Sequence, residues 1–256
     1  MGNYLSNVEL EQSVNMNLII DVGNTLSKVA VFNDDSIVFH EKHSTLSVDA
    51  FEKILRTYPI GKAIFSSTGE FPVYIEEFLS QRLPLLQFCS ETLLPIKNCY
   101  KTPQTLGADR LAAAVGAFVL FPHQNVLSID SGTAITYDLV TSKGEYLGGA
   151  ISPGIEMRFK SLHQFTARLP LITFNTNHPL IGYDTETSIL SGVLNGVLAE
   201  VDGYIAQIGA QYPPLTVVFT GGNSIYFDKK LKNSIFVNPN LVLFGLNRIL
   251  EYNENH

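Results

Sequence analysis

The chain alternates between short apolar runs, several ending in a turn with glycine, and longer stretches whose apolar residues recur every three or four positions. The short runs predict β-strands and the longer spacing predicts amphipathic helices. The expected strands are residues 17–22, 27–32, 37–41, 62–66, 85–88, 126–130, 134–140, 146–151 and 216–220. The expected helices are residues 48–58, 73–81, 108–120, 155–163, 185–210 and 241–252. This alternation predicts the α/β class.

One pattern occurs twice along the chain. Residues 19–25 and 128–134 each combine the end of an apolar strand, an Asp-x-Gly turn and the start of a second strand. In both halves three strands precede the first helix, which predicts two similarly folded domains facing a cleft. We place the first domain at residues 16–117 and the second at 118–256. The polar residues 1–15 are interpreted as an N-terminal extension, poorly ordered.

Composition narrows the class of function. With 256 residues, of which 45% are hydrophobic and 16% charged, the chain can bury substantial cores. A net charge of −7 argues against a nucleic-acid partner, because such binding relies on basic side chains. It leaves room for ATP, which backbone N–H groups and metal ions can hold.

The same inventory bears on location. No apolar run approaches the roughly 20 residues that span a bilayer, and no secretory signal is evident, so we expect no membrane partner. The two cysteines, Cys89 and Cys99, form neither a disulfide scaffold nor a zinc motif. We therefore expect a reduced, cytoplasmic protein.

The first Asp-x-Gly turn offers groups for phosphate and for metal. Gly23 lets the backbone approach a phosphate because no Cβ stands in the way, and Asn24, Thr25 and the amides that follow can donate hydrogen bonds. Asp21, at the end of a buried strand, is suited to hold a hydrated Mg²⁺. The alternative is a plain hairpin in which Asp21 caps the turn.

The second turn repeats this chemistry. Asp130 lies beside the apolar Leu127 and Ile129, and a carboxylate at the edge of a core is costly unless a cation or hydrogen-bond donors meet it. Thr133 and the amides near Gly132 provide a second contact for phosphate. From the residues alone we expect the two acidic turns to bind one triphosphate between them through Mg²⁺.

A third glycine-containing segment follows the strand at 216–220. Gly221, Gly222 and Asn223 stand at a strand end before a predicted helix, where the backbone can approach an adenosine closely. A Gly-Gly turn before an Asn/Ser helix cap is the simpler alternative. Because the segment follows two phosphate turns, we assign it to the nucleotide.

The helix at 108–120 begins with an acidic and a basic residue. On local evidence, Asp109 in the first turn is best explained by stabilisation of the helix dipole. The functional alternative is a base that accepts or orients a hydroxyl proton. Arg110 is adjacent and points elsewhere, so the two are not a helical ion pair. Arg110 would supply a fixed positive charge for an anionic group.

Five motifs, taken in order, resemble the type III pantothenate kinases. They are Asp-Val-Gly-Asn-Thr at 21–25, Gly-Ala-Asp-Arg at 107–110, Asp-Ser-Gly-Thr-Ala at 130–134, Gly-Gly-Ala-Ile-Ser-Pro-Gly at 148–154 and Gly-Gly-Asn at 221–223. The resemblance covers residues 16–250. It implies two duplicated ribonuclease H-like (actin-like ATPase) domains flanking a nucleotide cleft. It also implies that ATP phosphorylates the terminal hydroxyl of pantothenate, giving 4'-phosphopantothenate, in the first step of coenzyme A synthesis.

The resemblance also implies roles for individual residues. The ATP contacts would be Asp21, Val22, Gly23, Asn24, Thr25, Leu26, Ser27, Lys28 and Thr133. Asp109 would be the catalytic base, with substrate contacts from Tyr100, Gly107, Ala108, Asp109, Arg110 and Thr185. Asp130 would bind a monovalent cation, K⁺ or NH₄⁺, in place of the Mg²⁺ that the residues alone suggest. Two departures from the family pattern lie at Asp184 and in the loop 101–105.

The resemblance implies a homodimer in which the second subunit closes the substrate pocket. The helix at 185–210 has apolar residues four apart, which suits such an interface and suits a core helix equally well. Rival functions are a kinase for another small hydroxylated metabolite, a non-catalytic ATP-binding regulator, and an actin-like filament protein. An intact Asp109 argues against the regulator, and the short chain argues against the filament.

Overall fold

The computed structural model describes residues 15–254, so the predicted N-terminal extension lies outside the described residues except for Asn15. The first half contains β1 (Met16–Val22), β2 (Ser27–Asn33), β3 (Ser36–His43), α1 (Val48–Thr57), β4 (Ile60–Ser67), α2 (Val73–Ser80), β5 (Leu85–Gln87), β6 (Lys97–Asn98), the short 3₁₀ helix η1 (Pro103–Thr105) and α3 (Ala108–Leu120). The second contains β7 (Asn125–Ser131), β8 (Ala134–Val140), β9 (Glu145–Pro153), α4 (Ile155–Gln164), α5 (Thr185–Gln211), β10 (Leu215–Thr220), α6 (Ser224–Phe227), β11 (Phe236–Val237) and α7 (Leu241–Glu254).

The strands form two mixed sheets with the same internal order. The first sheet runs β3-β2-β1-β4-β5, and the second contains the matching series β9-β8-β7-β10-β11. In each series the first three strands are antiparallel and the last two join in parallel. The α/β class and the repeat predicted from the two Asp-x-Gly turns are therefore confirmed. The second sheet has one extra strand, because β6 pairs with β9.

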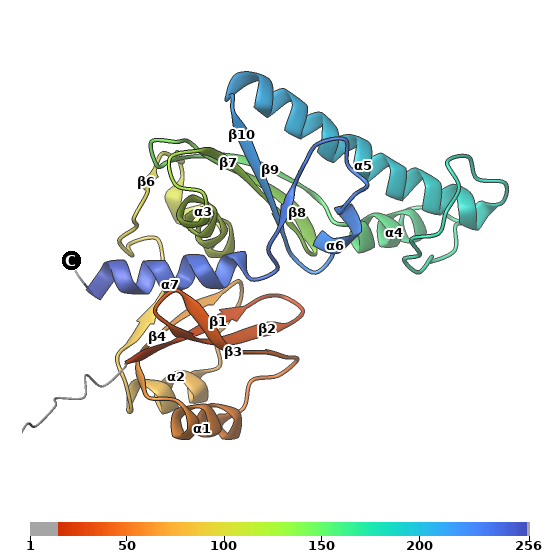
Figure 1. The fold of residues 1–256 in the computed structure, drawn as a ribbon. Helices are drawn as coiled ribbons and strands as arrows, with labels where there is room; N and C mark the ends of the chain where they lie inside the picture. Colours follow the sequence, from red (N-terminus) through yellow and green to blue (C-terminus); the bar gives the residue numbers. More distant parts are fainter. Residues whose placement is uncertain (1–14, 255–256) are drawn as a thin grey trace, which may run out of the picture.

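Alternation along the strands places each sheet between two cores. In β1, Leu18 and Ile20 belong to the core under α1 and α2, whereas Ile19 belongs to the core between the two sheets. In β7, Leu127 and Ile129 face the core beneath α4 and α5. Figure 1 shows the resulting layers, with α3 and α7 between the two sheets. The inner face of each sheet therefore points toward the other half of the molecule.

Helices α3 and α7 cross at backbone contact. A Cβ added to Gly116 would overlap the carbonyl oxygen of Leu241, and one added to Gly245 would overlap that of Ala112. Glycines at both positions let the two helices approach more closely than side chains normally allow. This crossing is the central connection between the two halves.

Helix α5 lies on the outer face of the second sheet (Figure 1). It is the one described helix that is long and apolar enough to cross a membrane by length and composition alone, and 44% of the relevant window is buried. Val193, Val197 and Val201 pack in the core beneath it, as expected for a partly buried core helix.

Four short elements differ from the expectation. The sequence predicts no helix or strand between residues 88 and 108, where β6 and η1 lie, and it does not predict β11. The strands β6 and β11 have two residues each and pair with a distant neighbour, so periodicity carries no signal for them. The helix expected after Gly222 is a single turn, α6.

Candidate active site

The two predicted acidic turns face the space between the sheets. Asp21 follows Ile19 at a two-residue interval and Asp130 follows Ser128, so strand alternation sends both carboxyls to the inner faces. Lys28 lies directly across from Asp21 on β2, and its Nζ donates to the carbonyl oxygen of Pro239 at 3.2 Å. The duplicated topology thus directs the two turns toward each other.

The pKa values of Asp21 and Asp130 depend on some of the same neighbouring charges. Burial raises the pKa of Asp21 to about 6, with the Lys28 ammonium opposing the rise and Asp109 adding to it. Burial likewise raises the pKa of Asp130 to about 6, again opposed by Lys28 and reinforced by the charges of Asp109, Asp21 and Asp138. The carboxyls of Asp21, Asp109 and Asp130 therefore act on one another across the space between the sheets, with Lys28 as the common countercharge.

The start of α3 holds Asp109. Gly107 is the N-cap residue, and the backbone N–H of Arg110 donates to Oδ1 of Asp109 at 2.9 Å. This hydrogen bond turns the carboxylate back over the first helical turn, where the helix dipole favours a negative charge. Ala108 and Asp109 are half-buried, so the carboxylate remains accessible to a bound molecule.

Arg110 makes contacts that the sequence did not indicate. Its Nε and Nη2 donate to Oδ1 of Asp138 at 3.0 and 2.7 Å, and the hydroxyl of Tyr146 donates to the same oxygen at 2.7 Å. Both ionic side chains are buried. The ring of Tyr100 lies 5.8 Å from the guanidinium carbon, beside Tyr146. Arg110 is therefore anchored to the second sheet, and it orients Tyr100 within the same cluster.

Among the described residues, no group of three or more His, Cys, Asp or Glu side chains is arranged to hold a metal ion. A cation at Asp21 or Asp130 must therefore take its other ligands from hydroxyls, carbonyls, water or phosphate, which are suitable donors for Mg²⁺ and for monovalent ions. Among the buried hydroxyl oxygens without a hydrogen-bond partner in the described part of the chain, those of Ser66 and Thr220 lie on the strands that flank the two turns. These unpartnered oxygens fit a cation or its hydration water.

Gly221 shapes the second turn's surroundings. Its φ is +89°, and a Cβ there would overlap Oδ1 of Asp130 and lie 2.6 Å from the carbonyl oxygen of Ser131. Asn223 donates its backbone N–H to the same carbonyl at 3.0 Å. The predicted glycine segment thus lies directly against Asp130, and only glycine fits at the point of contact. Gly222 has open space where a Cβ would stand.

The remaining predicted residues fall in three places. The loop from Val22 to Ser27 lines a cavity of about 220 Å³ together with the loop that precedes α1. Thr133 is exposed at the tip of the second turn, where its carbonyl accepts the N–H of Gly154 at 3.1 Å. Thr185 opens α5 and lines a separate cavity of about 940 Å³ between α4 and α5.

The unexpected Asp184 has a local explanation. It is the N-cap of α5, and its Oδ1 accepts both the backbone N–H and the hydroxyl of Thr187 at 2.7 Å. These hydrogen bonds keep the pKa of the Asp184 carboxyl below its usual value. Aspartate is among the residues favoured at this position. The departure thus serves helix capping.

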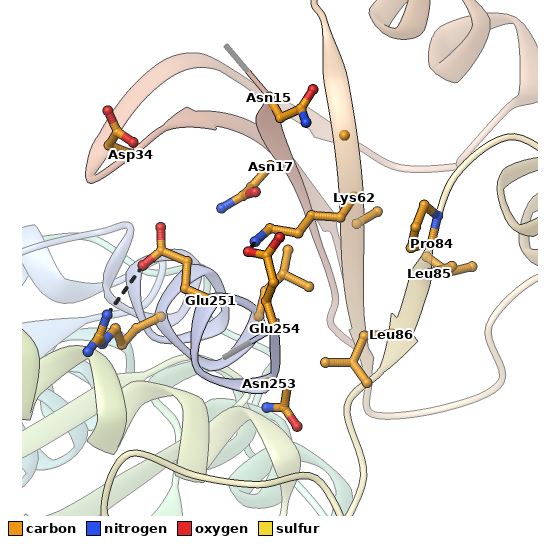
Figure 2. A pocket seen from close by; sticks show the side chains of 14 residues that line it. Asn15, Asn17, Asp34, Lys62, Pro84, Leu85, Leu86, Glu251, Asn253 and Glu254 are labelled. Carbon is orange, nitrogen blue, oxygen red and sulfur yellow. Dashed lines mark hydrogen bonds and ion pairs between the residues drawn. The ribbon is translucent and has the colours of Figure 1, made fainter. Parts of the chain in front are cut away.

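A further cavity, of about 660 Å³, opens between the first sheet and the C-terminal part of α7 (Figure 2). Four of its charged side chains form two pairs: Lys62 with Glu254, and Arg248 with Glu251 at 3.5 Å. No residue predicted to bind nucleotide or substrate lines it. We therefore place the candidate active site at the acidic turns and the start of α3.

Comparison with known proteins gives the following matches. The family model described as type III pantothenate kinase matches residues 17–207. A type III pantothenate kinase of Bacteroides fragilis is 48% identical over 239 residues, covering 93% of this chain and 98% of that protein.

Among solved structures, a conserved Campylobacter jejuni protein ascribed to the Baf family of transcriptional activators has a TM-score of 0.61 at 22% identity, covering 93% of this chain and 100% of that one. A ROK family protein of Streptococcus pneumoniae has a TM-score of 0.54 at 12% identity, covering 94% and 100%. At these identities the two structures show the fold alone.

Proposed function

The chain belongs to the type III pantothenate kinase family, and from this membership we propose that it transfers the γ-phosphoryl group of ATP to the terminal hydroxyl of pantothenate. The product, 4'-phosphopantothenate, is the first intermediate of coenzyme A synthesis. The structural observation that carries the proposal is the convergence of two Asp-x-Gly turns and Asp109 on one region between duplicated sheets.

The two turns and the glycine segment are suited to hold ATP. Residues 21–28 form one side, with the ammonium of Lys28 near enough to influence both Asp21 and Asp130. Thr133 and residues 221–223 form the other side, where the absence of a side chain at Gly221 leaves room beside Asp130. Two opposed backbone loops suit a polyphosphate, because oriented N–H groups hold anions without basic side chains.

Asp109 is the proposed base. Phosphoryl transfer proceeds through a loose transition state, so orienting the acceptor hydroxyl matters more than strong basicity. The backbone N–H that fixes Oδ1 of Asp109 leaves its other oxygen to accept a hydrogen bond from the pantothenate hydroxyl. The proposed substrate contacts next to Asp109 in the chain are Gly107, Ala108 and Arg110, and Tyr100 lies beside Arg110. We propose Thr185 as a further substrate contact.

A divalent ion accompanies ATP in this kinase family, and bound Mg²⁺ would neutralise charge on the phosphates. We propose that Asp21 contacts the hydrated Mg²⁺ and that Asp130 contacts a monovalent cation, K⁺ or NH₄⁺. The two carboxyls fit these roles because each has a raised pKa and lies next to an unpartnered hydroxyl.

We further propose a cytoplasmic homodimer with no nucleic-acid or membrane partner. Around the start of α5, Leu180, Ile181 and Tyr183 are about four-fifths exposed, and Phe165 is equally exposed at the end of α4. Large apolar side chains gathered on one surface suit contact with a second subunit. The cavity that contains Thr185 opens beside them, so a second copy would help to close it.

An assay that couples ADP release to pantothenate tests the activity. Wild-type protein is expected to turn over only with pantothenate present and faster with K⁺ or NH₄⁺, while Asp109→Asn loses about 10²–10⁴-fold in kcat. Asp49→Asn, in the first turn of α1 and exposed to solvent, serves as a control with the same change of charge. Turnover with another hydroxylated metabolite but not pantothenate would change the acceptor, and ATP binding without any turnover would favour the non-catalytic regulator.

A further inference from the structure

Two unpartnered hydroxyls occupy equivalent positions in the two halves. Ser66 on β4 is the register partner of Asp21 on β1, and Thr220 on β10 is the register partner of Asp130 on β7. Ser66 is 1% exposed and Thr220 is fully buried. Neither oxygen has a hydrogen-bond partner among the described residues.

Both hydroxyls face the same side as the carboxyl beside them. On β4, Ile64 lies in the core between the sheets and Phe65 in the core under α1 and α2, so Ser66 returns to the inner face. On β10, Val218 and Phe219 show the same alternation, which places Thr220 on the inner face. The buried hydroxyl of Ser131 falls on the opposite face of β7 and does not belong to this pair.

A buried hydroxyl without a partner is costly, and native proteins leave few of them. Here the exception occurs twice, at the same point of a duplicated fold and each time next to a carboxyl with a raised pKa. A carboxylate and a neighbouring hydroxyl provide oxygen ligands for a cation or for a water that a cation holds.

We propose that Thr220 completes a monovalent-cation site with Asp130, and that Ser66 completes the corresponding site for hydrated Mg²⁺ with Asp21. The choice of the two ions rests on the proposed function, whereas the two pairs of oxygen atoms rest on the fold. Each half of the molecule thus contributes one carboxylate–hydroxyl pair, and each pair responds to a different cation.

Melting temperatures test the inference without reference to turnover. In choline chloride with EDTA, Thr220→Val and Ser66→Ala are expected to melt no lower than wild type, because the oxygen they remove has no partner. With a non-hydrolysable ATP analogue present, K⁺ or NH₄⁺ at fixed ionic strength and Mg²⁺ should each raise the wild-type melting temperature.

The variants are expected to separate these responses. Thr220→Val should need about ten- to a hundredfold more K⁺ for the same rise while its Mg²⁺ response is kept, and Ser66→Ala should show the reverse. Thr220→Ser, which keeps a hydroxyl, should restore the K⁺ response. Ser128 is equally buried on the inner face of β7, but its hydroxyl donates to the carbonyl of Asp138 at 3.3 Å. Ser128→Ala should therefore melt lower in every buffer and keep both responses.

Three results would overturn the inference: a wild-type protein that responds to neither ion, variants that keep both responses, or variants that melt like Ser128→Ala in EDTA. The proposed function fails separately. If the melting temperatures respond to both ions as expected but pantothenate is not phosphorylated, the cation sites stand and the proposed acceptor is wrong. If pantothenate is phosphorylated but the variants do not separate the two ion responses, the proposed function stands and the cation sites are wrong.

Discussion

The two halves of the molecule share a strand order but differ at the positions that face their carboxyls. Opposite Asp21 stands Lys28, whereas Thr136 stands opposite Asp130. After the buried hydroxyl, the first half continues with Ser67 and the second with Gly221.

A second difference lies two residues further along β2 and β8. Ala30 is an apolar core residue on β2, and its counterpart on β8 is Asp138, paired with Arg110. The shared strand order therefore determines where the two carboxyls lie, whereas the side chains around each carboxyl differ between the halves. The first half supplies the positive charge of Lys28, and the second supplies the close contact of Gly221 with Asp130.

The largest expected effect comes from breaking the ion pair that only the second half has. Asp138→Asn leaves the Arg110 charge buried without its counterion, and we expect unfolding to become easier by about 3–5 kcal/mol. Chemical denaturation measures this. Glu145→Gln, which breaks the exposed pair with Lys97, is the control and should cost about 0–1 kcal/mol. Equal costs would mean that burial gives the Arg110 pair no special role.

A side chain at Gly221 should disrupt the close contact between this residue and Asp130 in the second half. Gly221→Ala places a Cβ against Asp130 at a positive φ, so we expect a loss of about 1–3 kcal/mol in unfolding free energy together with weaker ATP binding. Calorimetry and denaturation measure the two effects. At Gly222, where a Cβ meets nothing within 4 Å, the same substitution should stay within about 0.5 kcal/mol. A similar penalty at both positions would contradict this account.

The contribution of the Asp21 and Asp130 carboxyls to stability should depend on pH. Because the pKa values of Asp21 and Asp130 are about 6 in the folded protein, above the value of 3.8 for a free side chain, the folded state binds protons that the unfolded state does not. Without cations, the unfolding free energy contributed by these two carboxyls should therefore rise as the pH falls from about 7 toward 4. The rise is read as the difference between wild type and Asp21→Asn/Asp130→Asn.

Lys28→Met sharpens the comparison, because Lys28 lowers both pKa values from its place in the first half. The rise should then begin at a higher pH for both carboxyls. NMR titration of the two carboxyl groups measures this. A pKa change confined to Asp21 would show that Lys28 acts only on its own half.

The smallest effect concerns the outer layers, where the first half has the short α1 and α2 and the second has the 27-residue α5. Gly196 is exposed on α5 with open space around it, so Gly196→Ala should stabilise the protein by about 0.5–1 kcal/mol. Gly245→Ala on α7 is the contrast and should destabilise the protein by more than that gain, since its Cβ would overlap the Ala112 carbonyl. Both are measured by thermal denaturation, and destabilisation by Gly196→Ala would place that face of α5 in a contact.

Much of the fold could be predicted from local pattern. Alternating strands, the Ala-rich start of α3 and the repeated Asp-x-Gly turns depend on neighbours in the sequence, and they predicted both the class and the duplication. The bounds of β8 and α3 agree with the prediction. The roles assigned to Asp109, Thr133 and Thr185 stay predictions, because they depend on bound molecules.

The missed features depend on residues far apart in the chain. The bidentate contact of Arg110 joins positions 28 residues apart, and nothing near Asp138 in the sequence marks it as the partner. The unpartnered hydroxyls of Ser66 and Thr220 are likewise visible only once β4 and β10 are in register with the turn-bearing strands. The two-residue strands β6 and β11 were missed for the same reason, because each is defined by its pairing with a strand distant in the sequence.

The helix crossing at Gly116 and Gly245 has a consequence for synthesis on the ribosome. The first sheet is made early, but its inner residues Ile19 and Phe32 share a core with α7, the last helix of the chain, and Phe32 stacks edge-on with Phe244. Domains generally fold as the N-terminal part emerges. Here part of the inner face of the first sheet stays uncovered until α7 has been made, so the proposed division at 117/118 separates two halves that mature together.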